Sequence, residues 1–171
     1  TKTKTARFWS YVRDERPWCG AAPPCAWYQF SIDRKGEHPA NHLAGYTGTV
    51  HADGFAGFNG LFGKGKADEQ ACMVHVRRKF VDEVDRTGSP IAQQAIKQIA
   101  QLYAVEKEAR GNAPEERVTL RQANAKPVFD ELELWLQAQL RKISGKTKLA
   151  EAIRYALSRM PKARGYLSDG H

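Results

Sequence analysis

The spacing of the apolar residues changes near residue 89 and divides the chain into two halves of different character. From this point on, apolar side chains recur every three or four positions, which places them on one face of an α-helix. Ser89 suits the N-cap of such a helix, Pro90 suits its first turn, and Gly111 suits its end. The second half is therefore predicted to be entirely helical.

Three further helices are predicted after this one. The first spans residues 114–124, the second begins at Pro127 and ends at Ser144, and the third is capped by Thr147 and ends at Pro161. The residues predicted to face inward are Phe129, Leu132, Leu136, Leu140 and Ile143 in the second helix and Leu149, Ile153, Ala156 and Met160 in the third.

The first half carries shorter segments separated by glycine and proline. A short helix is predicted over residues 38–43, and strands over residues 6–14, 26–30, 46–52 and 71–76. The chain is thus predicted to be an α/β protein, with an α/β half over residues 1–80 and a helical half over residues 81–171. The pattern is compatible both with two subdomains and with a helical insertion into an α/β fold.

The charge of the chain favours a polyanionic partner. The formal net charge is +8, and such an excess raises encounter rates with nucleic acid, although a basic surface also serves solubility alone. The odd number of cysteines, Cys19, Cys25 and Cys72, does not suit a disulfide framework and predicts a reducing, cytoplasmic setting. No apolar run approaches the ~20 residues of a membrane span, so no membrane partner is expected.

Asp53 is the leading candidate for a catalytic and metal-binding residue. It follows a predicted strand and precedes Gly54, so its carboxylate can project into a cleft with little obstruction from its own backbone. Phosphodiester chemistry uses divalent metals held by several such carboxylates, and one aspartate does not complete that site. The alternative interpretation is an ordinary Asp-Gly turn.

Arg77, Arg78 and Lys79 are the candidate DNA-binding residues. They follow the predicted strand 71–76, and their side chains can bind phosphates by charge and bidentate hydrogen bonds. A solvated helix start is the alternative. Cys72 and His75 have the spacing of half a zinc site, but core residues explain them better. Three tryptophans are expected in the core rather than in base stacking: Trp9, Trp27 and Trp135.

Four separated segments, in order and with matching spacing, resemble the IS sixty-six group of bacterial insertion-sequence transposases. They are residues 51–59, around Asp53 and Gly54, and residues 71–80, 99–106 and 152–159. Residues 3–9 and 34–39 are similar to the same family. The resemblance therefore covers essentially the whole chain.

The resemblance implies a ribonuclease-H-like mixed sheet, of which residues 1–80 form a part, with residues 81–171 as a helical insertion subdomain. It implies a triad of two aspartates and a glutamate that binds two Mg²⁺ or Mn²⁺ ions and cuts and joins transposon ends and target DNA. Asp53 matches the second carboxylate of that triad, and the other two are expected outside this chain. The chain is therefore expected to be a central fragment, incomplete for catalysis, of a homo-oligomeric enzyme.

Two other functions remain open. One is a non-catalytic basic module for DNA binding or oligomerisation. The other is a stand-alone nuclease, which needs a second carboxylate near Asp53; Asp33, Asp68 and Glu69 are the candidates, and their predicted loop settings argue against them.

Overall fold

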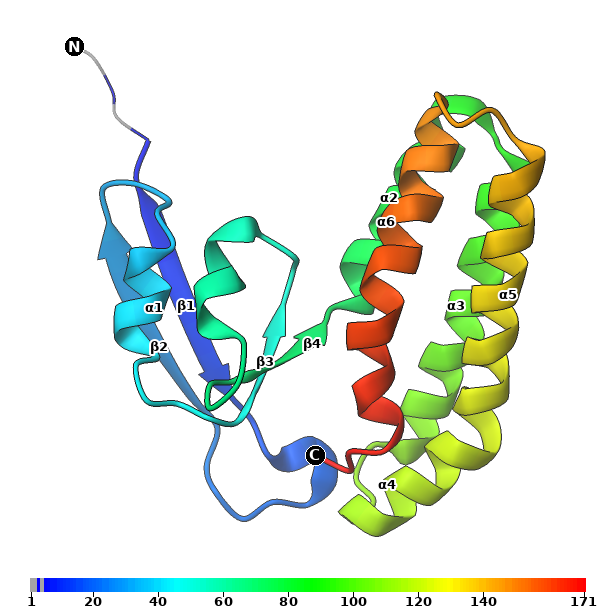
Figure 1. The fold of residues 1–171 in the computed structure, drawn as a ribbon. Coiled ribbons are helices and arrows are strands. Elements are labelled where there is room, and N and C mark those ends of the chain that lie inside the picture. The colour runs from blue at the N-terminus through cyan, green and yellow to red at the C-terminus, as the bar shows by residue number, and fades with distance from the viewer. Residues whose placement is uncertain (1–2, 4) are drawn as a thin grey trace.

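The computed structural model describes residue 3 and residues 5–171. An α/β part, formed by the first 71 or so residues, lies beside an elongated bundle of helices, and strand β4 (Asp68–Ala71) leads directly from one into the other (Figure 1). Within the described residues, no helix combines the length and the apolar character that crossing a membrane requires.

The first two strands form an antiparallel hairpin. Strand β1 (Arg7–Arg13) pairs with β2 (Cys25–Ser31), and a 3-10 turn, η1 (Arg16–Trp18), lies between them. One face of the hairpin is covered, because Trp9 is buried and donates from its indole N–H to Ser31 Oγ at 2.8 Å. The opposite face exposes large apolar side chains, namely Phe8, Val12, Tyr28 and Phe30.

The predicted core position of Trp27 is wrong, whereas that of Trp9 is confirmed. Trp27 is 61% exposed, although it lies on the same face of the hairpin as Trp9. Its position near the turn explains the difference. Trp9 is packed against the rings of His38 and Phe58, whereas Trp27 stacks on the ring of the exposed His42.

The other two strands form a separate parallel pair. Strand β3 (Thr49–Ala52) pairs with β4 in register from Thr49 opposite Asp68 to Ala52 opposite Ala71, and the connection contains a 3-10 helix, η2 (Ala56–Leu61). The predicted short helix is present as α1 (Glu37–His42). The broad α/β class is confirmed, but in the described part the strands form two two-stranded sheets rather than one continuous mixed sheet.

The predicted strand over residues 71–76 is wrong, because this segment begins a helix. Strand β4 ends at Ala71 and α2 spans Met73–Thr87. Val76 and Phe80 are buried while Val74 is 54% exposed, which is the spacing of a helix face. A short apolar run fits a strand or a helix equally well when only local periodicity is considered.

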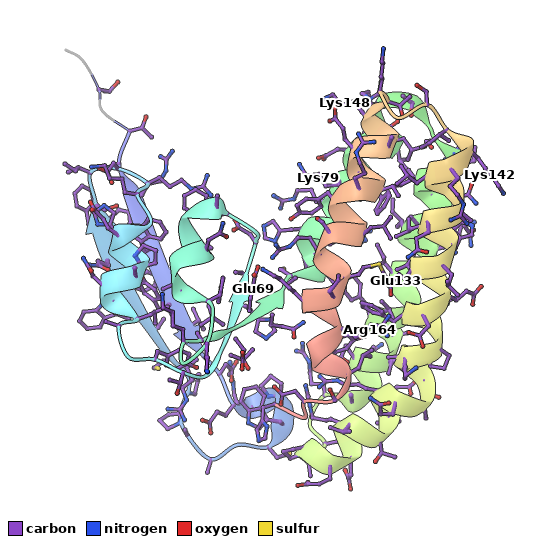
Figure 2. The ribbon with its side chains drawn as sticks, in the orientation of Figure 1. Glu69, Lys79, Glu133, Lys142, Lys148 and Arg164 are labelled. Carbon is purple, nitrogen blue, oxygen red and sulfur yellow. The ribbon has the colours of Figure 1, made fainter. Side chains whose placement is uncertain are left out.

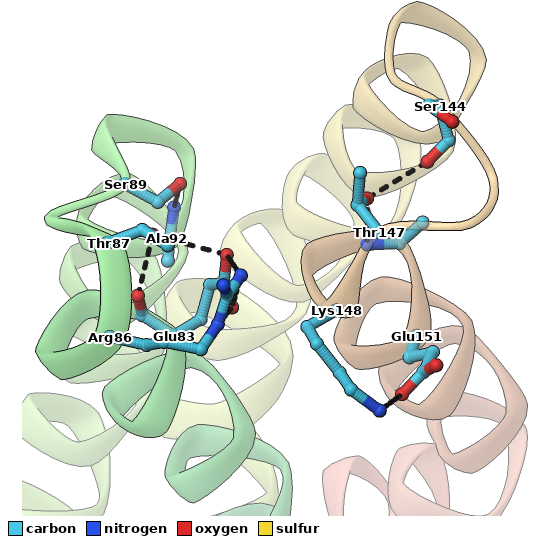
Figure 3. A network of polar contacts seen from close by, with 10 residues as sticks. Glu83, Arg86, Thr87, Ser89, Ala92, Ser144, Thr147, Lys148 and Glu151 are labelled. Carbon is cyan, nitrogen blue, oxygen red and sulfur yellow. Dashed lines mark hydrogen bonds and ion pairs between the residues drawn. The ribbon is translucent and has the colours of Figure 1, made fainter.

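Helix α2 packs with α3 (Pro90–Ala109), α5 (Lys126–Lys142) and α6 (Lys148–Ala163) into the bundle on the right of Figure 1. The bundle core contains the predicted inward-facing residues, of which these are fully or almost fully buried: Phe129, Leu132, Leu136, Ile153, Ala156 and Met160. Both predicted caps are confirmed, since Ser89 Oγ accepts from Ala92 N–H at 3.3 Å and Thr147 Oγ1 accepts from Ala150 N–H at 3.1 Å. Figure 3 shows the region around these caps.

The predicted break at Pro127 is wrong. Helix α4 (Pro114–Leu120) continues through a π-helical turn, Arg121–Ala125, into α5, and α6 likewise continues past Pro161 to Ala163. The π turn shifts the backbone hydrogen-bond register just before Pro127, the residue that lacks an N–H donor. It also carries Arg121, which is buried and donates to both carboxylate oxygens of Glu106 at 2.7 Å.

The two parts are joined by polar contacts between β4 and α6. Glu69 forms ion pairs with Arg159 and Lys162, and its side chain is only 5% exposed. Figure 2 shows Glu69 where the α/β part meets the bundle. The side-chain amide of Gln70 donates to the Ala163 carbonyl oxygen at 2.8 Å. The predicted domain boundary at residue 80 falls within α2, which packs against α3 and α6. The division of the chain into domains stays a prediction.

Replacement of Phe80 tests the assignment of α2 to the bundle core. Phe80→Ala removes a fully buried ring and is expected to lower the free energy of unfolding by about 3–5 kcal/mol, because the cavity is only partly refilled. Val74→Ala, on the exposed side of the same helix, is the matched control and is expected to change it by less than about 0.5 kcal/mol. Urea unfolding followed by circular dichroism measures both; equal losses would contradict this packing.

Replacement of Glu69 tests the junction between the two parts. Burial by itself would raise the Glu69 pKa, but hydrogen bonds from Lys162 and Arg159 outweigh it and hold this pKa below its ordinary value. The ionised form therefore stabilises the fold above about pH 4.5, and this contribution is lost as the pH falls through the lowered pKa. Glu69→Gln is expected to cost about 2 kcal/mol at pH 7 and to flatten the loss of stability below pH 5.

The control for this experiment is Glu151→Gln, which removes an exposed ion pair with Lys148 at 2.9 Å (Figure 3). Its urea midpoint should stay close to that of the parent chain, because exposed pairs contribute little. An unchanged midpoint in Glu69→Gln at pH 7 would show that the ion pairs do not hold the junction.

Candidate functional site

Asp53 lies immediately after β3, as the sequence predicts. Its Oδ1 accepts a hydrogen bond from the Phe55 N–H at 2.9 Å, and its side chain is 35% exposed. This is the geometry of an Asx turn, in which an aspartate bonds to its own backbone two residues on. The turn leaves the second carboxylate oxygen, Oδ2, available, so the turn interpretation and a functional role are compatible.

Helix α6 holds this turn from the side of the bundle. The Tyr155 hydroxyl donates to the Asp53 carbonyl oxygen at 3.0 Å. Burial raises the pKa of this hydroxyl above its ordinary value, so Tyr155 stays protonated as a donor at neutral pH. Gly54 has φ +81°, and a Cβ there would lie 3.2 Å from Cζ of Arg159. Both the backbone conformation and the close approach of Arg159 favour glycine at this position.

A cleft of about 450 Å³ opens between the α/β part and the bundle at this point. Its walls include Asp53 and five side chains that can bind or orient an anion, namely Arg34, His75, Arg78, Lys79 and Tyr155. Lys79 lies on the side of the bundle that faces the α/β part, as Figure 2 shows. The cleft therefore collects residues from four separate segments of the chain.

The cleft carries more positive than negative charge. Arg34 Nη2 lies 3.9 Å from Asp53 Oδ2, and the Arg34 guanidinium carbon lies 3.9 Å from the centre of the Phe55 ring. Lys79 Nζ lies 5.7 Å from the centre of the Tyr155 ring. With Arg78, three cations line the same cleft as this one carboxylate. Such an arrangement attracts an anionic group toward Asp53.

The helical conformation of α2 separates the three basic residues. His75, Arg78 and Lys79 are spaced by three and four positions, so they share one helix face, and this face lines the cleft. Arg77 is turned about 100° from Arg78 and does not line the cleft. The structure thus places Arg78 and Lys79 in the same cleft as Asp53 and leaves Arg77 outside it.

The residues present do not by themselves fit a two-metal site. Among the described residues, no three histidine, cysteine, aspartate or glutamate side chains are grouped so that they could hold a metal ion. The other carboxylates nearby are engaged elsewhere or exposed. Asp33 Oδ1 lies 2.7 Å from His38 Nε2, Asp68 is exposed, and Glu69 forms ion pairs with Arg159 and Lys162. Of these carboxylates only Asp53 lines the cleft. Cys72 precedes α2 as its N-cap residue and is free.

Sequence reasoning missed Arg34 and Tyr155 as site residues. Arg34 follows β2 by three positions and Tyr155 lies in the middle of α6, and neither is close to Asp53 in sequence. The available signal was weak: both residues belong to segments that resemble the transposase group, but no local pattern distinguishes them from other surface residues. Only the packing of α6 against the end of β3 brings them together.

The chain matches the model of the family described as "Transposase IS66 family" over residues 1–171. It is 38% identical over 188 residues to the uncharacterized protein y4hP and 35% identical over 175 residues to the uncharacterized protein y4jD, both of Sinorhizobium fredii. A third uncharacterized protein of the same organism, y4qI, is 38% identical over 177 residues.

These alignments cover 99% of this chain but only 33–34% of the relatives, so the chain spans about a third of their length. No solved structure matches the chain. The full-length family match, together with these relatives, shows that the chain belongs to the IS66 family of transposases.

Proposed function

We propose that this chain is the part of a DNA transposase that carries one catalytic carboxylate, Asp53, and the cations that bind DNA phosphates beside it. The longer protein would cut transposon ends and join them to target DNA. Family membership supports the reaction class. Because the chain spans about a third of its relatives, the proposed activity is that of a protein of their length, in which these residues would supply part of the site.

The observation that carries the proposal is the position of Asp53 in a basic cleft. A carboxylate at the end of a strand shares the cleft with Arg34, Arg78 and Lys79, which come from both parts of the molecule. A purely turn-forming Asp-Gly needs no such surroundings. Cations at this place would hold a negatively charged backbone close to a carboxylate that otherwise repels it.

The proposal also includes the metal ions, the complete sheet and the assembly of the longer protein. Asp53 would be one carboxylate ligand of Mg²⁺ or Mn²⁺, with further carboxylates supplied by parts of the longer protein, because the described residues do not complete a site. A ribonuclease-H-like sheet would form when further strands extend the two small sheets. Homo-oligomerisation and a cytoplasmic location are proposed from the family resemblance and the cysteine content.

Replacement of Asp53 in the full-length protein tests the catalytic role. Asp53→Ala is expected to lower the rate of divalent-metal-dependent cleavage of a labelled transposon-end duplex by about 10³-fold or more, the scale expected when several kcal/mol of transition-state stabilisation are lost. Asp68→Asn, on the neighbouring strand and exposed, is the matched control and should cleave like the parent enzyme. Full activity of the Asp53 variant would overturn the assignment.

A second candidate function is a non-catalytic DNA-binding module. Two observations favour it: the cleft contains a single carboxylate, which alone does not form a two-metal site, and the net charge of +8 is sufficient for DNA binding without catalysis. On this alternative, Asp53→Ala would leave both the binding and any processing of DNA unchanged, and binding would depend on salt alone.

Single replacements in the basic run separate the residues that contact DNA. Arg78→Gln and Lys79→Gln are each expected to weaken binding of a labelled duplex, because each removes a phosphate contact. Each should also reduce the slope of the log binding constant against the log salt concentration by about one. Arg77→Gln, outside the cleft, should have a smaller effect. Fluorescence anisotropy across a salt series measures all three; an equal or larger loss for Arg77→Gln would place the DNA on another face of α2.

A further inference from the structure

Arg34 is held over the cleft by stacking rather than by a close ion pair. Its guanidinium carbon lies 3.9 Å from the centre of the Phe55 ring, and the Phe55 ring packs in turn against Trp9, with ring centres 6.4 Å apart. Stacking restrains the plane of the guanidinium and leaves its N–H donors at the edge. The Arg34 side chain is 52% exposed, so these donors are accessible from the cleft.

The contact between Arg34 and Asp53 leaves most of this donor capacity unused. Nη2 is 3.9 Å from Asp53 Oδ2, which is too long for a hydrogen bond, and the Arg34 guanidinium donates no hydrogen bond to any other described residue. A guanidinium has five donors arranged for bidentate contact with a phosphate or carboxylate. Arg34 therefore offers an anion-binding group that the fold itself does not occupy.

The opposite wall offers a second group of the same kind. Arg78 is exposed on α2 and forms no hydrogen bond or ion pair with any other residue that the structure describes. Lys79, one position further on, lies over the Tyr155 ring. The two arginines belong to different parts of the molecule, and the cleft between them, about 450 Å³, is of the size that takes a small ligand or one unit of a polymer.

We propose that Arg34 and Arg78 bind one phosphodiester group of a DNA backbone between them, from opposite walls of the cleft and next to Asp53. Arg34 thus belongs to the DNA-binding site, together with the basic residues of α2. This inference rests on the proposed function in taking DNA as the ligand. It goes beyond that proposal in adding a residue from the α/β part and in assigning both arginines to the same phosphate.

A double-mutant cycle tests the shared phosphate. The chain is titrated into a labelled oligonucleotide duplex, with fluorescence anisotropy as the readout, for Arg34→Gln, Arg78→Gln and the double variant. Each single change is expected to weaken binding about tenfold, as for a charge-assisted contact. If one phosphate contacts both, the double variant should lose clearly less than the product of the single losses.

Two further variants make the result specific. Lys142→Gln removes one positive charge from the outer side of the bundle, far from Lys79 in Figure 2, and should change the affinity less than twofold. Arg34→Lys keeps the charge but not the planar fork, so it should restore the salt dependence while recovering only part of the affinity. Urea midpoints close to that of the parent chain establish that each variant is folded.

Several outcomes would overturn the inference. Unchanged affinity and salt dependence in Arg34→Gln would remove Arg34 from the site, and fully multiplicative losses would assign the two arginines to different phosphates. Competition by a mononucleotide or inorganic phosphate at the same concentration as the oligonucleotide would show a site for a small phosphate ligand instead.

The inference and the proposed function fail separately. If Asp53→Ala abolishes cleavage by the full-length protein while Arg34→Gln leaves DNA binding unchanged, the inference falls and the function stands. If Arg34-dependent binding is found but the full-length protein cleaves no DNA under any divalent metal, the function falls and the phosphate site stands.

Discussion

The seam between α6 and the ends of β3 and β4 is the contact on which the candidate site depends. One side of α6 supplies Tyr155, which bonds to the Asp53 carbonyl oxygen, and Arg159, which covers Gly54 and pairs with Glu69. Without this seam the turn at Asp53 would have only its local Asx hydrogen bond. The cleft exists because the bundle is held against the α/β part at this edge.

The same seam also keeps several charged side chains close together without leaving all of their charge uncompensated. Glu69 lies beside Arg159 and Lys162 and neutralises much of their charge beneath the turn. The cations that remain free to act, Arg34, Arg78 and Lys79, lie on the cleft walls, where solvent moderates their mutual repulsion. The fold thus separates cations with a structural function from cations available to a ligand.

Much of the helical half could be predicted because its signals are local. Ser89 and Thr147 cap helices through hydrogen bonds to residues three positions on, and the stripe through Phe129, Leu132 and Leu136 follows the helical period. The conformation of residues 71–76 could not be assigned in this way, because a short apolar run suits a strand and a helix equally well. Only the packing of Val76 against the bundle distinguishes the buried from the exposed residues of this segment. The break predicted at Pro127 was wrong for a related reason. A π-helical turn just before Pro127 accommodates this residue, and no local sequence pattern predicts that turn.

The sequence by itself determined the family, the position of Asp53 at a strand end and the basic residues that follow, because each of these depends on nearby residues or on their order along the chain. The tertiary structure alone decided that Arg78 and Lys79 face Asp53 while Arg77 does not, and that Arg34 and Tyr155 complete the cleft. These residues are far apart in sequence, and they meet only because burial of the apolar faces of α2 and α6 fixes which side of each helix is turned toward β3.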